Sequence, residues 1–239
     1  MQRLKTLQHV HSHEGDDSIH KLLSAWIKAV ERYTKAFKDN PWWYNERASL
    51  SVLAGAAWTI KDWFALEEFS TLKRLRKLTP GVDEGDLRIG RCDLFICNPN
   101  ESFAIEAKQA LQSIGLKSDG ESYMNRAVKG AWDDSGDLGS WEAGRRFGVT
   151  FVVPTIPLNE VQAGPGKRVQ ICPAKVEAAL SRWLTDEPDF AGWSLKPTQF
   201  AYIFPNVGNQ DYVSGHRYYP GIVVILEERL RANRLSQNS

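Results

Sequence analysis

Apolar residues recur at steps of three and four along several stretches, a pattern that predicts amphipathic helices. The first stretch covers residues 19 to 38 and follows Asp17-Ser18, a pair that can cap a helix. A polar leader with His9, His11 and His13 precedes it. Further helices are predicted from about Pro41 to Trp58, from Glu121 to Trp132, and from Pro173 onward. Short helices are also predicted at Gln109–Ile114 and in the charged tail from Glu227.

Short apolar runs predict strands of a central sheet. Residues 147–153, 200–204 and 221–226 are nearly continuous apolar runs, as expected for strands that are covered on both faces. A further strand is predicted over roughly Ala65 to Lys73, ahead of two apolar runs that flank a turn signal. Helices and strands in this order predict an α/β fold, a mixed central sheet flanked by helices.

The two runs and their turn, residues 88–109, predict a β-hairpin with Asn98-Pro99-Asn100-Glu101 at its tip. If Pro99 and Asn100 form the centre of the turn, paired residues have numbers that sum to 199. Asp93 then lies opposite Glu106, with Cβ atoms about 4.5–5.5 Å apart. Lys108 shares a face with Glu106, because side chains alternate along a strand.

Two opposed carboxylates destabilise a β-ladder unless a cation lies between them. Ligands that are all oxygen atoms suit Mg²⁺, Mn²⁺ or Ca²⁺ better than zinc or copper. A metal ion held by Asp93 and Glu106 would activate a water molecule and neutralise charge on a phosphoryl group. Lys108 would hold or deprotonate the attacking water or stabilise the developing charge, and partial burial near a cation would lower its pKa.

Composition limits the alternatives. The chain has 239 residues, 42% hydrophobic and 25% charged, as in ordinary globular proteins. Its formal net charge of +1 gives no overall basic field, so any contact with nucleic acid must rest on a local patch. No apolar run reaches the ~18 residues of a membrane helix or forms a signal peptide, and we expect no membrane partner. Three cysteines without Cys-x-x-Cys spacing suit buried thiols in a reducing cytoplasm.

The best local basic patch contains Lys73 and Arg74, followed across an acidic loop by Arg88 and Arg91. These side chains are candidate phosphate contacts, which would give salt-dependent, sequence-independent affinity. In the predicted register Arg91 faces Lys108, and two facing cations would attract an anion. The alternative is a solvated surface, which the neighbouring acids favour.

Asp93, twelve further residues and then Glu106-Ala107-Lys108 resemble the motif of the PD-(D/E)XK nuclease superfamily, with Cys92 at the usual proline position. The resemblance covers roughly Glu46 to Val153 and implies a restriction-endonuclease-like αβββαβ core. An N-terminal helix and C-terminal strands would be additions to that core. The resemblance also implies that Asp93, Glu106 and the Ala107 carbonyl hold the metal ion. Glu46, on the helix before the sheet, matches the position of an auxiliary carboxylate, with Glu67 and Glu68 as competitors.

We therefore expect a leader and packing helix at residues 1–40, a nuclease domain at 41–230 and a frayed tail at 231–239. The leading hypothesis is a Mg²⁺- or Mn²⁺-dependent nuclease that hydrolyses phosphodiesters, most simply in DNA. Cutting two strands would favour a homodimer. The alternatives are a non-catalytic nucleic-acid-binding or assembly module on the same fold, and a metal-dependent hydrolase of a small phosphorylated substrate.

Overall fold

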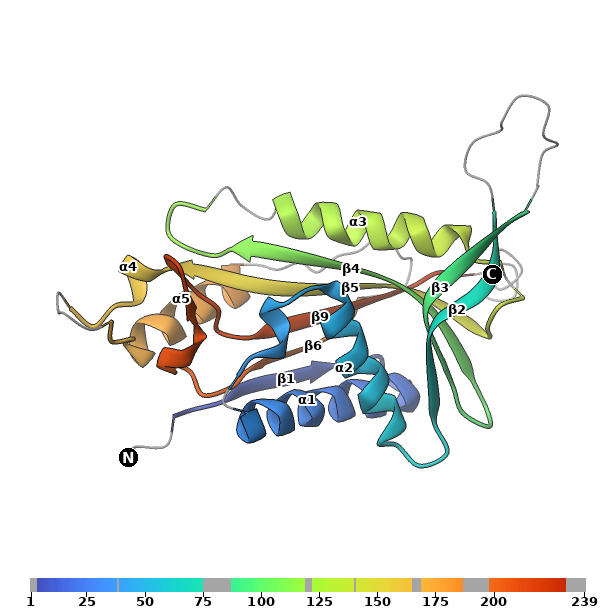
Figure 1. Ribbon diagram of the computed structural model, residues 1–239, viewed down its shortest axis with the longest axis horizontal. Helices are drawn as coiled ribbons and strands as arrows, with labels where there is room; N and C mark the ends of the chain where they lie inside the picture. The colour runs from blue at the N-terminus through green and yellow to red at the C-terminus, as the bar shows by residue number, and fades with distance from the viewer. Residues whose placement is uncertain are drawn as a thin grey trace, which may run out of the picture.

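The computed structural model describes residues 4–37, 39–74, 87–118, 122–139, 141–164, 169–186 and 198–230. It is a mixed α/β structure with helices on a central sheet (Figure 1). The helices are α1 (Asp17–Phe37), α2 (Glu46–Trp58), α3 (Ser122–Asp137), α4 (Leu158–Val161) and α5 (Pro173–Asp186), with 3₁₀ turns η1 (Pro41–Trp43) and η2 (Gln210–Tyr212). The strands are β1 (Leu7–His11), β2 (Phe64–Arg74), β3 (Leu87–Cys97), β4 (Ser102–Ser113), β5 (Arg145–Pro157), β6 (Gln199–Phe204), β7 (Val213–Ser214), β8 (Arg217–Tyr218) and β9 (Ile222–Glu228).

The main sheet has the strand order β1-β6-β9-β5-β4-β3-β2. Strands β4 and β5 are parallel and are joined through α3, whereas the other neighbours in this order are antiparallel. β5 lies in the middle, and all its residues except the two ends are buried. That burial explains its continuous apolar sequence, because both faces of the strand are covered.

Helices cover the sheet from two sides. In Figure 1, α3 lies along one side of β4 and β5, while α1 and α2 lie on the other side. Gly148 of β5 lets α3 approach closely, since a Cβ atom at this position would lie 2.8 Å from the backbone carbon of Ala131. Among the described helices, none is long and apolar enough to cross a membrane.

The N-terminal segment belongs to the sheet. β1 pairs with β6, and His11 stacks on Phe200 with ring centroids 5.0 Å apart, so the predicted polar leader contains a strand of the sheet. The predicted α1 helix is confirmed, but Asp16 caps it, accepting a 3.4 Å hydrogen bond from the Ile19 amide. Its apolar face joins the same core cluster as β5 and β9.

Two other local predictions are wrong. Residues 109–114 continue β4 to Ser113, because the strand gains a parallel partner in β5 up to Thr155. Glu227 and Glu228 end β9 and pair with β5, rather than starting a helix. The predicted second helix divides into η1 at Pro41 and α2, which is capped by Asn45. The predicted tail at 231–239 lies outside the described residues.

Candidate active site at the opening between β3 and β4

The hairpin has the predicted register but opens before it reaches the predicted acids. Leu94 pairs with Ile105, so paired numbers sum to 199, and the β3–β4 ladder ends at that pair. The turn forms as expected, with the Glu101 amide donating to the Asn98 side chain at 3.0 Å. On the other side of β3, strand β2 has a distortion opposite Asp93, where Glu68 adopts a left-handed φ of 55°. β3 therefore leaves β4 at Asp93.

Beyond the end of the β3–β4 ladder, two backbone amides of β4 donate hydrogen bonds to carboxylates instead of to the backbone of β3. The Ala107 N–H donates to Oδ2 of Asp93 at 2.8 Å, and the Gln109 backbone donates to Glu46. Asp93 thus lies in the opening beside the edge of β4, which corrects the prediction of a ladder pair with Glu106. The Ala107 carbonyl faces the same opening, because the N–H and C=O of one strand residue point to the same side.

Glu106 is the most buried acid of this group, with 3% of its surface exposed. Its Oε1 forms an ion pair with Nζ of Lys73, a β2 residue, at a distance of 2.6 Å. The lysine stem crosses β3 at Gly90, where a Cβ atom would lie 2.9 Å from Cδ of Lys73. Burial raises the pKa of Glu106 to about 7, and the charge of Asp93 adds to the increase. Lys73 opposes both effects.

Lys108 extends toward α3. Its Nζ lies 2.6 Å from Oδ2 of Asp134, and the side chain is about half buried. Burial alone would lower the pKa of Lys108, but the hydrogen bond and charge of Asp134, with the charges of Glu46 and Asp93, raise it. In the metal-free protein the pKa of Lys108 is therefore raised, and the side chain is an ammonium ion at neutral pH; the lower pKa beside a bound metal ion stays a prediction.

Glu46 comes closest to the site among the three candidates for an auxiliary carboxylate. Burial raises its pKa, and the charge of Asp93 adds to the increase while Lys108 opposes it. Glu67 accepts a hydrogen bond from the Ser51 hydroxyl at 3.1 Å. Glu68 forms ion pairs with two arginines, 2.9 Å from Arg47 and 3.1 Å from Arg91.

The predicted basic patch divides into two environments. Lys73 is buried at Glu106, whereas Arg74, Arg88 and Arg91 are exposed along the β2–β3 arm. Arg91 pairs with Ser70 on β2 and does not face Lys108, because the hairpin has opened. Phosphate contacts by the three arginines stay predictions.

Sequence reasoning missed Asp134 and the internal role of Lys73. Asp134 belongs to α3 and meets Lys108 only because the helix packs onto β4 and β5. Its sole signal in the sequence is the acidic pair Asp133-Asp134, which directly follows the helix predicted at Glu121–Trp132. Lys73 is separated in sequence from Glu106, and the glycine that admits its stem has no pattern of its own.

The arrangement offers oxygen donors for one hard cation. Within the described part of the chain, no three side chains of His, Cys, Asp and Glu are arranged to hold a metal ion. Mg²⁺ needs fewer protein side chains than three, because it binds through one or two carboxylates and keeps several water molecules. Asp93, Glu106 and the Ala107 carbonyl could supply such a set. Burial raises the pKa of Glu106 first and the charge of Asp93 second, and a cation beside both carboxylates would favour their charged forms.

We expect the stability of the metal-free protein to fall as pH rises through the titration of Glu106. Its pKa is raised from 4.5 to about 7, so the folded state binds the proton more tightly. The associated stabilisation is complete below pH 4.5 and is lost as pH rises to about 7, in total about 3 kcal/mol. Urea unfolding in EDTA at several pH values measures it. Glu106→Gln should remove this contribution to the slope of the unfolding free energy against pH. An unchanged slope would mean that Glu106 is not the group that titrates.

Comparison of the chain with protein-family models, with curated proteins and with solved structures gave no match.

Proposed function

We propose that this chain is a metal-dependent nuclease that hydrolyses phosphodiester bonds, most simply in DNA, with Mg²⁺ or Mn²⁺ as cofactor. The observation that carries the proposal is the meeting of Asp93, Glu46 and Glu106 with Lys108 where β3 leaves β4. Three acids and an ammonium ion beside the opening of β4, with Asp93 coupled electrostatically to each of the other three groups, match what phosphodiester hydrolysis requires.

The order of elements supports the same proposal. From α2 onward the chain runs α2-β2-β3-β4-α3-β5. This succession has the αβββαβ order of a restriction-endonuclease-like core, and the acids occupy the hairpin and its preceding helix as that resemblance implies. β1, α1 and the strands after α5 would then be additions around the core.

In this proposal a bound divalent ion neutralises phosphoryl charge and makes its water more acidic. Asp93, Glu106 and the Ala107 carbonyl would hold the ion. Lys108, kept charged by Asp134, donates hydrogen bonds to the attacking water or to a phosphoryl oxygen and does not accept a proton. Glu46, whose pKa is raised by burial, is the better proton acceptor, at its carboxylate oxygens.

The ion pairs favour a second candidate, a non-catalytic binding or assembly module. Lys73 already neutralises Glu106 and Lys108 already neutralises Asp134, each at 2.6 Å. A protein that never binds a metal ion would need such pairs to bury its acids. Against this candidate, Asp93 and Glu46 add further negative charge to the same opening.

Incubation with end-labelled duplex DNA, single-stranded DNA and RNA, each with Mg²⁺, Mn²⁺ or EDTA, tests the proposal. A nuclease cleaves at least one substrate in a metal-dependent manner, and calorimetry with Mn²⁺ detects binding that Asp93→Asn abolishes. Binding of nucleic acid without cleavage under any of these conditions, and without Mn²⁺ uptake, would establish the second candidate instead.

Lys108→Ala should lower the cleavage rate by roughly a hundredfold or more and largely retain Mn²⁺ binding, because the ammonium contributes to the transition state. The chain offers a matched control in Lys129→Ala, which removes another lysine that lies 2.6 Å from an α3 aspartate, Asp133. Equal rates for the two variants would rule out a role for Lys108 in the reaction.

A further inference from the structure

Helix α1 carries a row of cations on its outer surface. Lys21, Lys28, Arg32 and Lys35 are all exposed, at steps of seven, four and three residues. These steps place all four on one side of the helix, opposite its buried apolar face, over a length of about 21 Å. We call this row the α1 basic row. An exposed row of this kind is ordinarily a solvated helix surface, so a binding role needs further support.

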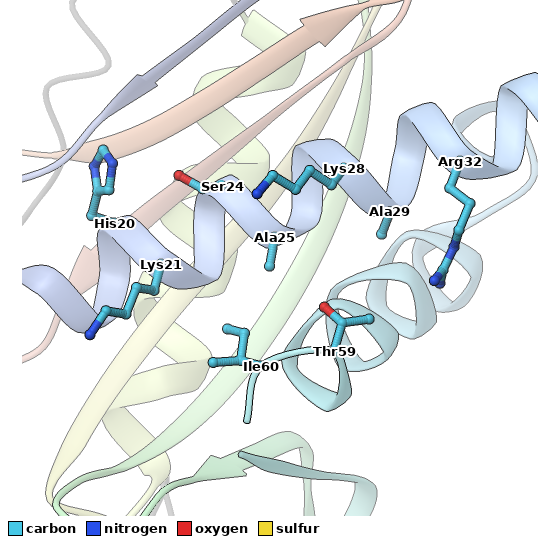
Figure 2. Close-up of a pocket in the computed structure, with 9 residues that line it drawn as sticks. All are labelled: His20, Lys21, Ser24, Ala25, Lys28, Ala29, Arg32, Thr59 and Ile60. Atoms are coloured by element: carbon cyan, nitrogen blue, oxygen red, sulfur yellow. The ribbon is translucent and has the colours of Figure 1, made fainter. Parts of the chain in front are cut away.

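Two hollows adjoin the α1 basic row. One, of about 490 Å³, lies between α1 and the end of α2, and Figure 2 shows Thr59 and Ile60 facing Ala25 and Ala29 across it. The other, of about 540 Å³, lies between α1 and the segment around Asn206. Lys28 and Arg32 line both hollows. The row therefore borders a recess, which the small side chains Ala25 and Ala29 keep open.

The row carries an excess of positive charge. Among the described residues, none of its four cations forms an ion pair. Glu31 is the acidic residue in the linings of the two hollows. The linings of the two hollows thus hold four cations and one acid, a net charge of +3, and Asp17 lies one turn before Lys21, whereas the whole chain carries +1. Such a local excess attracts a polyanion.

We propose that the α1 basic row binds the phosphate backbone of a nucleic-acid strand outside the cleavage site. A row of about 21 Å suits an extended polyanion with one phosphate per 3.4 Å of duplex axis on each strand, not one small anion. No lining residue of either hollow is a large exposed hydrophobe, as a membrane-binding surface would require.

The inference rests on the proposed function and adds to it. Glu46 begins α2 and Thr59 follows its end, so the row and the site are on the order of 20 Å apart along that helix. At 3.4 Å per base pair, this span corresponds to about six base pairs of the same substrate. The row would hold the flanking duplex and leave base identity unread, because backbone contacts carry no sequence information directly.

The test uses the double variant Lys28→Gln/Arg32→Gln, since glutamine keeps helix propensity. Binding of a fluorescent 20-base-pair duplex in EDTA is followed by anisotropy at several salt concentrations. Loss of two phosphate contacts should lower the slope of log K against log salt by about 1.8 and weaken binding at least about tenfold at ~0.1 M salt. The matched control is Lys117→Gln/Lys175→Gln, which removes two exposed positive charges elsewhere.

Equal weakening by both double variants would overturn the proposal, as would wild-type protein that fails to bind the duplex. Loss of binding to anionic phosphatidylserine vesicles, with duplex binding unchanged, would assign the row to a membrane and also overturn it. The proposed function fails separately: if wild-type protein cleaves nothing but the row variant alone loses duplex affinity, the binding site stands and the nuclease does not.

Discussion

Replacement of Asp93 by asparagine is expected to reduce metal-dependent cleavage by at least about a thousandfold. A metal ion contributes several kcal/mol to charge stabilisation, and each 1.36 kcal/mol corresponds to a tenfold rate. The amide oxygen of asparagine can still accept from the Ala107 N–H, now 2.8 Å from Oδ2, so the bend in β3 should persist. The rate of cleavage of a labelled duplex under single-turnover conditions measures the effect.

The control for Asp93→Asn is Asp133→Asn, which removes an exposed α3 carboxylate that is paired with Lys129. We expect the control to cleave at the wild-type rate. Both variants should unfold at similar urea concentrations, since neither change removes a buried apolar group. Cleavage by Asp93→Asn within tenfold of wild type would mean that this carboxylate is not a metal ligand.

Lys73→Met is expected to destabilise the metal-free protein by about 3–5 kcal/mol at pH 8. The change keeps a long apolar stem across Gly90 but leaves Glu106, 4% exposed in its side chain, without its ammonium partner. Removing one partner of a buried ion pair leaves an uncompensated charge, which costs about this much. Urea unfolding in EDTA at pH 8 and pH 5.5 measures the loss.

The loss should be smaller at pH 5.5, because the pKa of Glu106 is about 7 and the carboxyl group is then mostly neutral. A double variant, Lys73→Met/Glu106→Gln, should recover much of the stability at pH 8, since two neutral side chains leave no buried charge. An equal loss at both pH values would show that the lysine stem, and not its charge, stabilises the fold.

The pattern of turn residues and apolar runs was sufficient to predict the β3–β4 hairpin and its register. The turn Asn98-Pro99-Asn100 and two apolar runs determined the pairing of Leu94 with Ile105, because strand side chains alternate and a one-residue slip would expose the buried side. Apolar residues at steps of three and four predicted α1, and a continuous apolar run predicted the buried strand β5. The mixed sheet with flanking helices follows from these elements.

Tertiary contacts decided what the pattern could not. Residues 109–113 extend β4 because they pair with the parallel strand β5. His9 and His11 lie in a strand because β1 pairs with the edge of β6 that β9 does not cover. Within the site, Glu106 was predicted to meet Asp93 through a ladder, but the two strands separate just before that pair. The cation beside Glu106 comes from Lys73, a contact that depends on the absence of a side chain at Gly90.

Gly148, which pairs with Glu106 across β4 and β5, sets the distance between α3 and the sheet on the side where Lys108 meets Asp134. A methyl group there would meet the Ala131 backbone at 2.8 Å, so any larger residue would lift the helix from β5. Asp134 lies one turn further along that helix and would move with it, away from the ammonium group. The spacing between the two backbones thus determines whether the ammonium group of Lys108 keeps its aspartate partner.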